Sequence, residues 1–138
     1  MKPVFQQTQN DCYSACIASI FDLDLVDVPN FFNVAGYDRD AWWDAVRSYL
    51  RTLGYGVVSL TLDRDNLAQL GGFLICSGPP VNRVEHMDTN HATVWYGGEM
   101  IHDPHPSGAG IKDVECIDVF YPLNPSRMFY MGPQNGSV

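Results

Sequence analysis

The spacing of apolar positions changes from helical to strand-like part-way along the chain. Residues 11–21 are apolar or small on every face, which is typical of a helix buried in the core, and Asn10 or Asp11 is placed to cap it. Residues 24–32 repeat the helical pattern weakly, and Pro29 limits them to one short helix or two turns. The first part of the chain is therefore predicted to be mainly helical.

The strongest helical signal lies in residues 38–53. One face of this segment is apolar, and Gly54 is placed to end the helix, as glycine commonly does. The apolar face consists of Trp42, Val46, Tyr49, Leu50 and Leu53. We interpret Trp42 as a core residue and the adjacent Trp43 as a contact residue, because neighbouring helical positions do not face the same way.

After Gly54 the pattern has a period of two, which is typical of strands. Predicted strands occupy residues 55–62, 73–76 and 113–121, with a short helical turn at residues 63–70. Two further β-rich runs flank Gly97 and Gly98, and a Gly-Gly pair between such runs indicates a tight hairpin. These two runs are residues 92–96 and 99–102.

The hairpin allows a register to be counted from the sequence. If Gly97 and Gly98 form the turn, residues whose numbers sum to 195 lie opposite each other, so residue 91 pairs with about residue 104. Facing residues of antiparallel strands have Cα atoms roughly 4.5–5.5 Å apart. His91 and Asp103 are therefore predicted to lie side by side.

At 138 residues, the chain is long enough for a single domain with its own core. We expect an α+β fold in which a mainly helical half, residues 1–54, packs on a mainly antiparallel β half, residues 55–121. Residues 122–138 are predicted to form a C-terminal tail rich in Pro, Gly and Asn.

Charge and targeting signals limit the class of partner. The net charge of −8 repels nucleic-acid phosphates and anionic membrane surfaces, so neither is an expected partner. Neither a signal peptide nor a membrane-spanning run is evident, which favours a cytoplasmic location. The four cysteines are then expected to be free thiols, with Cys16, Cys76 and Cys116 in the core.

Cys12 is the candidate nucleophile. It begins the predicted buried helix, where the helix dipole and unpaired N–H groups favour a thiolate. Such a thiolate needs an imidazole to move protons and an acceptor to orient that imidazole, and His91 with Asp103 supplies both. Gln6, six residues before Cys12, is placed to donate to an oxyanion, although Gln7 and Gln9 compete for this role.

The chain resembles papain-like cysteine peptidases, and most closely the double-glycine peptidase domains of bacteriocin-exporting ABC transporters. The resemblance rests on three matching runs, which together span residues 6–104. They are Gln6 to Cys16 with Asp11-Cys12 at its centre, His91-Ala92-Thr93-Val94, and Asp103-Pro104. Tyr13 stands where the family usually has glycine, and the hairpin between the histidine and the aspartate is shorter than in the family.

The resemblance implies a papain-like fold and a Cys-His-Asp triad of Cys12, His91 and Asp103, with Gln6 as oxyanion-hole donor and no cofactor. The expected protein is a stand-alone bacterial or phage version that cleaves a peptide, isopeptide or related amide bond in a peptide or protein substrate. Two alternatives remain open. One is an acyltransferase or transglutaminase-like enzyme with the same triad, and the other is a catalytically silent binding or effector protein.

Other residues near the site compete for these roles. His86 is a rival of His91, whereas His102 is expected to point away from residue 103 and His105 to reach the same rim. Both are more often surface or loop histidines than catalysts.

Cys12 and Cys16, together with His91 and with Asp103 or His105, are the candidate ligands of a zinc site. Their one-turn spacing differs from the two-residue spacing of zinc knuckles and argues against it. The cleft walls are expected to come from Tyr13, Trp43, the loop at residues 81–90 and the Pro/Gly-rich loop at residues 103–110.

Overall fold

The computed structural model describes residues 1–81 and 90–124, so His86 and most of the predicted tail lie outside the described residues. The helical elements and strands follow the order predicted from the sequence. The helices are α1 (Cys12–Ile20), η1 (Leu25–Asp27), α2 (Phe31–Ala35), α3 (Arg39–Thr52) and η2 (Arg64–Gln69). The strands are β1 (Tyr55–Leu60), β2 (Leu74–Gly78), β3 (His91–Tyr96), β4 (Glu99–His102) and β5 (Cys116–Pro122).

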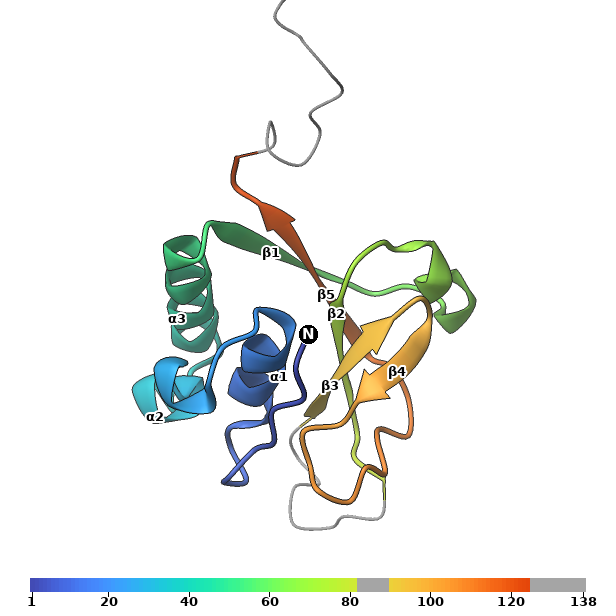
Figure 1. Ribbon diagram of the computed structural model, residues 1–138, viewed down its shortest axis with the longest axis horizontal. Helices are drawn as coiled ribbons and strands as arrows, with labels where there is room; N and C mark the ends of the chain where they lie inside the picture. Colours follow the sequence, from blue (N-terminus) through green and yellow to red (C-terminus); the bar gives the residue numbers. More distant parts are fainter. Residues whose placement is uncertain (82–89, 125–138) are drawn as a thin grey trace, which may run out of the picture.

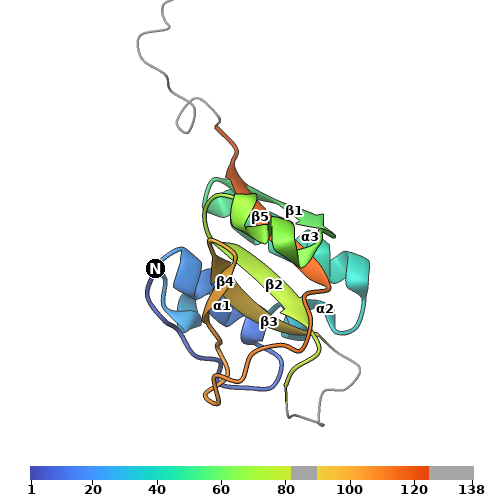
Figure 2. The ribbon, with the colours of Figure 1, turned by 90° about the vertical axis from the view of Figure 1, so that its right-hand side faces the viewer.

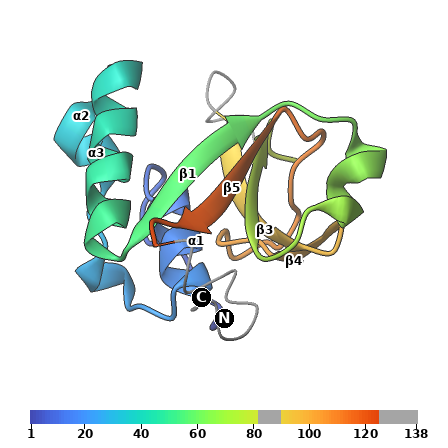
Figure 3. The ribbon, with the colours of Figure 1, turned by 90° about the horizontal axis from the view of Figure 1, so that it is seen from above.

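A five-stranded sheet with the order β1-β5-β2-β3-β4 forms the centre of the molecule (Figure 1). All neighbouring strands run antiparallel. The helices α1, α2 and α3 lie on one side of the sheet, and η2 lies on the other, as the view from above shows (Figure 3). The strands β2, β3 and β4 cross the side view in front of α1 (Figure 2).

Two apolar clusters fill the space on the two faces of the sheet. The larger joins α1 and α3 to β2 and β3, and includes Ile17, Leu50 and Val94, each with no exposed surface. The smaller lies under η2, where Leu67 and Trp95 are buried. Because successive side chains of a strand point to opposite faces, Val94 and Trp95 serve different clusters.

Polar side chains begin two of the helices. Asp38 accepts a hydrogen bond from the backbone N–H of Ala41 at the start of α3, and Asn30 accepts one from Asn33 at the start of α2. Pro29 separates η1 from α2, so the weak pattern at residues 24–32 produces two turns, as expected for a segment that proline interrupts.

The residue pairing predicted for the hairpin is correct next to the turn and wrong farther along the two strands. Gly97 and Gly98 both have positive φ, which a tight two-residue turn requires, and Tyr96 lies opposite Glu99. A bulge between Val94 and Trp95 then moves the pairing by one residue, so Val94 faces His102. The bulge adds a residue to one strand, which a count from the turn does not include.

Gly78 ends β2 opposite His91, the first residue of β3. A Cβ atom at Gly78 would collide with the backbone carbonyl oxygen of Asp113, so only glycine fits. Gly71 has nothing within 4 Å of such an atom and has no positive φ.

We predict that Gly78→Ala lowers the free energy of unfolding by at least about 1–3 kcal/mol, because backbone must move to admit the methyl group. Urea denaturation measures the loss, with Gly71→Ala as the matched control. Equal stability of the two variants would contradict the prediction.

Candidate active site

Cys12 is the first residue of α1, and its side chain is half-buried. Residues 13–19 of α1 are buried against β3 and the core, which fixes the position of the first turn of the helix. A thiol at this place adjoins the unpaired N–H groups of the helix N-terminus. The helix therefore leaves Cys12 partly exposed at its N-terminus, whereas the second cysteine, Cys16, has no exposed surface.

His91 and Asp103 form a buried pair. His91 Nε2 lies 2.6 Å from Asp103 Oδ1, and both side chains are almost fully shielded from solvent. His91 begins β3, and Asp103 directly follows β4, so the hairpin brings together two residues twelve positions apart. The structure thus places His91 next to Asp103, as counting residues from the Gly97-Gly98 turn predicted. The pairing of β3 with β4 is, however, shifted by one residue from the predicted pairing.

The loop after β4 returns to hold Asp103. Its Oδ2 accepts a hydrogen bond of 2.7 Å from the backbone N–H of Gly110, and its Oδ1 accepts one of 2.9 Å from the N–H of His105. These two donors were not predicted. The Pro/Gly-rich composition indicated an irregular loop, but composition does not say which N–H groups turn inward.

The surroundings of His91 and Asp103 favour the charged form of both side chains. Burial opposes the charge on His91, but the hydrogen bonds that its ring makes to Asp103 and Cys12, together with the charges of both partners, outweigh burial and raise the pKa of His91. Burial likewise opposes the charge on Asp103, yet its bonds to His91, His105 and Gly110 lower its pKa. Because Nε2 of His91 faces Asp103, the other ring nitrogen, Nδ1, is the one left for the thiol of Cys12.

Gln6 lies in the N-terminal segment beside the same loop. Its backbone N–H donates to the carbonyl of Pro104 at 2.9 Å, directly after Asp103. Its side-chain Nε2 donates one N–H to the carbonyl of Thr8. Among the described residues, its Oε1 is the one buried side-chain nitrogen or oxygen without a hydrogen-bond partner. The amide is therefore held near the site without using all of its hydrogen-bonding capacity.

The capping role expected of Asp11 is corrected by the structure. Asp11 precedes α1 and is buried, but its carboxylate makes no capping bond to the helix. It instead accepts from the backbone N–H groups of Gln7 and Thr8. Asp11 therefore closes the turn that leads from Gln6 to α1. Asp side chains commonly accept hydrogen bonds from nearby backbone N–H groups in this way.

The histidines that flank Asp103 have separate surroundings. His102 is buried, contrary to the expectation of a surface residue, because its Nε2 bonds to the carbonyl of Val4 at 2.7 Å. His105 Nδ1 pairs with Ser107 at 2.8 Å, and its ring lies edge-on to that of His91 at 6.4 Å. The rings of His102 and His105 thus have hydrogen-bond partners of their own, Val4 and Ser107.

Tyr13 was expected in the cleft wall, but it is buried under the site. Its hydroxyl donates to Asp118 Oδ2 at 2.8 Å, and Asp118 is buried in the middle of β5. Ser59 and Cys116 hydrogen-bond to the other carboxylate oxygen. Burial raises the pKa of Asp118 despite these donors. Cys116, expected in the core, is half-buried because it begins its strand beside this group.

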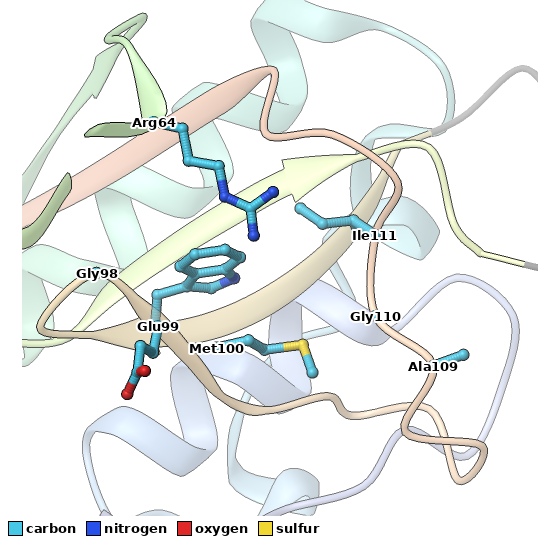
Figure 4. A pocket seen from close by; sticks show the side chains of 8 residues that line it. Arg64, Gly98, Glu99, Met100, Ala109, Gly110 and Ile111 are labelled. Atoms are coloured by element: carbon cyan, nitrogen blue, oxygen red, sulfur yellow. The ribbon is translucent and has the colours of Figure 1, made fainter. Parts of the chain in front are cut away.

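Two hollows flank the sheet. One, of about 490 Å³, lies between the start of α3 and Asn90, and Trp42 and Trp43 both line it. The other, of about 240 Å³, lies on the opposite face, where the guanidinium of Arg64 stands 5.4 Å from the ring centroid of Trp95 (Figure 4). Trp42 was interpreted as core alone, whereas it contributes to both core and hollow.

The described residues contain no group of three or more His, Cys, Asp or Glu side chains arranged to hold a metal ion. In the same part of the chain, no helix has the length and apolar character needed to cross a membrane.

No family model matches the chain, and no curated protein matches it. Among solved structures, it is similar to the peptidase domain of Streptococcus ComA, a bi-functional ABC transporter involved in a quorum-sensing pathway. The two sequences are 18% identical, the match covers 88% of this chain and 98% of that one, and the TM-score is 0.57. The two chains share a fold. The predicted α+β papain-like fold is thereby confirmed, as is the likeness in fold to the peptidase domain of an ABC transporter.

The pKa of His91 gives a prediction that NMR can check. The ring should titrate with a midpoint above the ordinary value of 6.5, and the midpoint should fall in both Cys12→Ala and Asp103→Asn. Because the folded pKa is raised, the pair stabilises the fold fully below pH 6.5, and this stability is lost as pH rises through the folded pKa. A wild-type midpoint at or below 6.5 would be inconsistent with the structure.

The Tyr13 contact gives a second prediction. Tyr13→Phe keeps the ring and its packing but removes the donor to Asp118 Oδ2, which leaves part of a buried carboxylate unpaired. We expect a loss of about 1–3 kcal/mol in the free energy of unfolding. Chemical denaturation at neutral pH measures it, and Tyr37→Phe, at an exposed tyrosine, is the control. Losses of the same size in both variants would count against this role.

Proposed function

We propose that the chain is a thiol hydrolase of the cysteine peptidase type, with Cys12 as nucleophile, His91 as general acid and base, and Asp103 as the residue that orients His91. The observation that carries the proposal is the buried 2.6 Å pair of His91 and Asp103 within electrostatic reach of a cysteine at a helix N-terminus. The fold of a peptidase domain supports it, and so does the raised pKa of His91.

In the proposed reaction, the Cys12 thiolate attacks the carbonyl carbon of an amide bond. The oxyanion accepts hydrogen bonds from the backbone N–H of Cys12 and from the amide of Gln6. Nδ1 of His91 then gives its proton to the leaving amine, and a thioester remains on Cys12. His91 next takes a proton from water, the hydroxide attacks the thioester, and the product leaves as a carboxylic acid while the thiol is restored.

Asp103 acts on this cycle through His91. Its carboxylate keeps the ring in one orientation with Nδ1 towards Cys12, and it stabilises the imidazolium that exists before each proton transfer. The N–H groups of Gly110 and His105 hold Asp103 in turn, so the ring orientation rests on backbone rather than on mobile side chains.

Reaction with iodoacetamide at pH 6–7 tests the activated thiolate without knowledge of the substrate. Cys12 should be alkylated at least about tenfold faster than a free thiol, since an ordinary cysteine is mostly protonated at this pH. His91→Ala should lose that excess rate. Mass spectrometry of tryptic peptides assigns the label to Cys12, and Cys12→Ala gives the background from the other cysteines.

Circular dichroism spectra of both variants provide the control for folding. If folded wild-type protein reacts at Cys12 no faster than a free thiol does, the proposal fails. Incubation with a peptide library then distinguishes hydrolysis from transfer, because only hydrolysis adds one water to the fragments and leaves no product joined to a second amine.

A further inference from the structure

The hollow of about 240 Å³ on the η2 side of the sheet has the features of a ligand site, and we call it the Arg64 pocket. Its volume is below the roughly 300–1,000 Å³ typical of sites for drug-sized ligands, so only a small molecule or a single side chain fits. Arg64 of η2 lies on one side, and the β3–β4 hairpin and residues 109–111 surround the rest (Figure 4). The pocket thus lies where three separate segments of the chain meet.

Arg64 is the cation of the pocket. Its guanidinium lies 5.4 Å from the ring centroid of Trp95, a distance at which a cation and an aromatic ring attract each other. Within residues 1–81 and 90–124, the side chain of Arg64 takes part in no ion pair and no hydrogen bond. The N–H donors of the guanidinium are therefore available to a ligand.

A second arginine of the chain has the same ring contact but a different charge environment. The guanidinium of Arg47 also lies 5.4 Å from a tryptophan ring, that of Trp43. Arg47, however, pairs with Asp44, with 3.8 Å between Nη1 and Oδ1. The described part of the chain supplies no such counter-charge to Arg64. An arginine that lines a hollow without a counter-charge favours an anionic ligand, because carboxylates and phosphates are its strongest partners.

The other side chains around the pocket are apolar where they face it. Figure 4 shows the indole of Trp95, the thioether of Met100 and the side chain of Ile111 around the same space, whereas the carboxylate of Glu99 points away from it. Apolar walls cannot replace the water that a second charged group of the ligand would lose. The lining therefore matches a ligand with one negative charge and an apolar body.

Hydrogen bonds hold the walls of the Arg64 pocket in place without a ligand. The N–H of Gly110 donates to Asp103 Oδ2 at 2.7 Å, and the carbonyl of Gly110 accepts from the N–H of Val81 at 3.1 Å. The indole N–H of Trp95 donates to Thr93 at 2.8 Å. A ligand would therefore meet walls that are already organised, which lowers the entropic cost of binding.

We propose that the Arg64 pocket binds a small carboxylate with an aromatic or branched apolar body. The guanidinium of Arg64 donates two parallel N–H bonds to the carboxylate, as its fork-like geometry allows. The apolar body lies against Trp95, Met100 and Ile111. A free organic acid and the C-terminal residue of a peptide share this chemistry.

This binding site goes beyond the thiol hydrolase function and does not require it. Neither Cys12 nor His91 lines the pocket. The two sites nevertheless share one segment, because the backbone of Gly110 lines the pocket and its N–H holds Asp103. A ligand in the Arg64 pocket would thus contact the loop that is bonded to Asp103.

An NMR titration that follows the indole N–H signals of the three tryptophans tests the site. Phenylpropionate at pH 7 and low salt should shift the Trp95 signal with a dissociation constant below about 10 mM, which small ligands commonly reach. The signals of Trp42 and Trp43 should not move, since both line the hollow on the other side of the sheet. Trp42→Phe and Trp43→Phe assign the three signals.

Related probes separate the charge from the apolar body. Phenylpropionamide, which is neutral, should bind at least about tenfold more weakly than the acid, because it loses a charge-assisted hydrogen bond. Acetate, which lacks the apolar body, should bind more weakly than phenylpropionate as well. Phenylpropylamine tests the opposite charge, since Glu99 lies at the edge of the pocket.

A charge-removing variant assigns the preference to Arg64. Arg64→Gln should reduce the affinity for phenylpropionate at least about tenfold and leave the affinity for phenylpropionamide unchanged. The side chain is exposed, so the variant should keep its fold, which its NMR spectrum verifies. Arg47→Gln is the matched control, because it removes a guanidinium at the same distance from a tryptophan ring outside the pocket.

Acetyl-glycyl-phenylalanine and its C-terminal amide distinguish the two sources of the carboxylate. If the peptide acid shifts the Trp95 signal and its amide does not, the pocket accepts the C-terminus of a peptide. If phenylpropionate alone shifts that signal, the ligand is a free organic acid. Both results support a carboxylate site.

Four results would overturn the proposal. They are an unmoved Trp95 signal over the whole titration, equal affinities for the acid and its amide, tighter binding of the amine, and an unchanged affinity for the acid in folded Arg64→Gln. None of them depends on how fast iodoacetamide alkylates Cys12. The Arg64 pocket and the hydrolase function can therefore fail independently.

Discussion

The packing of α1 against β3 is the constraint on which the proposed site depends. The helix is hydrophobic nearly all round, and small residues such as Ala18 and Ala92 belong to the buried cluster where it meets the sheet. Small side chains let a helix approach a strand closely, and close approach leaves little freedom in how the two are aligned. Cys12 begins one element and His91 begins the other, so this alignment sets the distance between thiol and imidazole.

The N-terminal segment joins this contact to the far end of the hairpin. Val4 donates its N–H to Ser19 in α1 and accepts from His102 in β4, while Gln6 donates to the carbonyl of Pro104. The segment thus lies along both the helix and the strand end, and it carries Gln6 to the site as a consequence. Residues without catalytic roles therefore fix the geometry of those that are proposed to have them.

Features that depend on local sequence patterns or on counting from a turn could be predicted from the sequence. Helical and strand spacing predicted the order of elements, and the Gly97-Gly98 turn placed His91 near Asp103. It could not predict the bulge after Val94, since a bulge depends on how the strand must bend to fit its neighbours. Nor could it predict that Asp11 bonds backwards to Gln7 and Thr8, because a free side chain at a helix start has several donors within reach.

The catalytic roles of Cys12, His91, Asp103 and Gln6 remain predictions that the geometry makes specific. Long-range pairs were the hardest features to anticipate. The bond between Tyr13 and Asp118 joins residues 105 positions apart, and nothing near either residue in the sequence indicates the other. Cys116 was expected in the core on strand pattern alone, but its position at the strand end left it half-buried.

The loop after β4 restricts which residue can stand at position 103. Three donors converge on the two oxygens of Asp103, namely the ring of His91 and the N–H groups of His105 and Gly110. An asparagine has one oxygen and an NH₂ group. In either orientation of the amide, its NH₂ group would face one of these N–H donors and could not accept a hydrogen bond from it. Papain-like proteases commonly orient their histidine with an asparagine. In this chain, the side chain at position 103 is bonded both to the ring of His91 and to two N–H groups of the loop, and a carboxylate can accept all three hydrogen bonds.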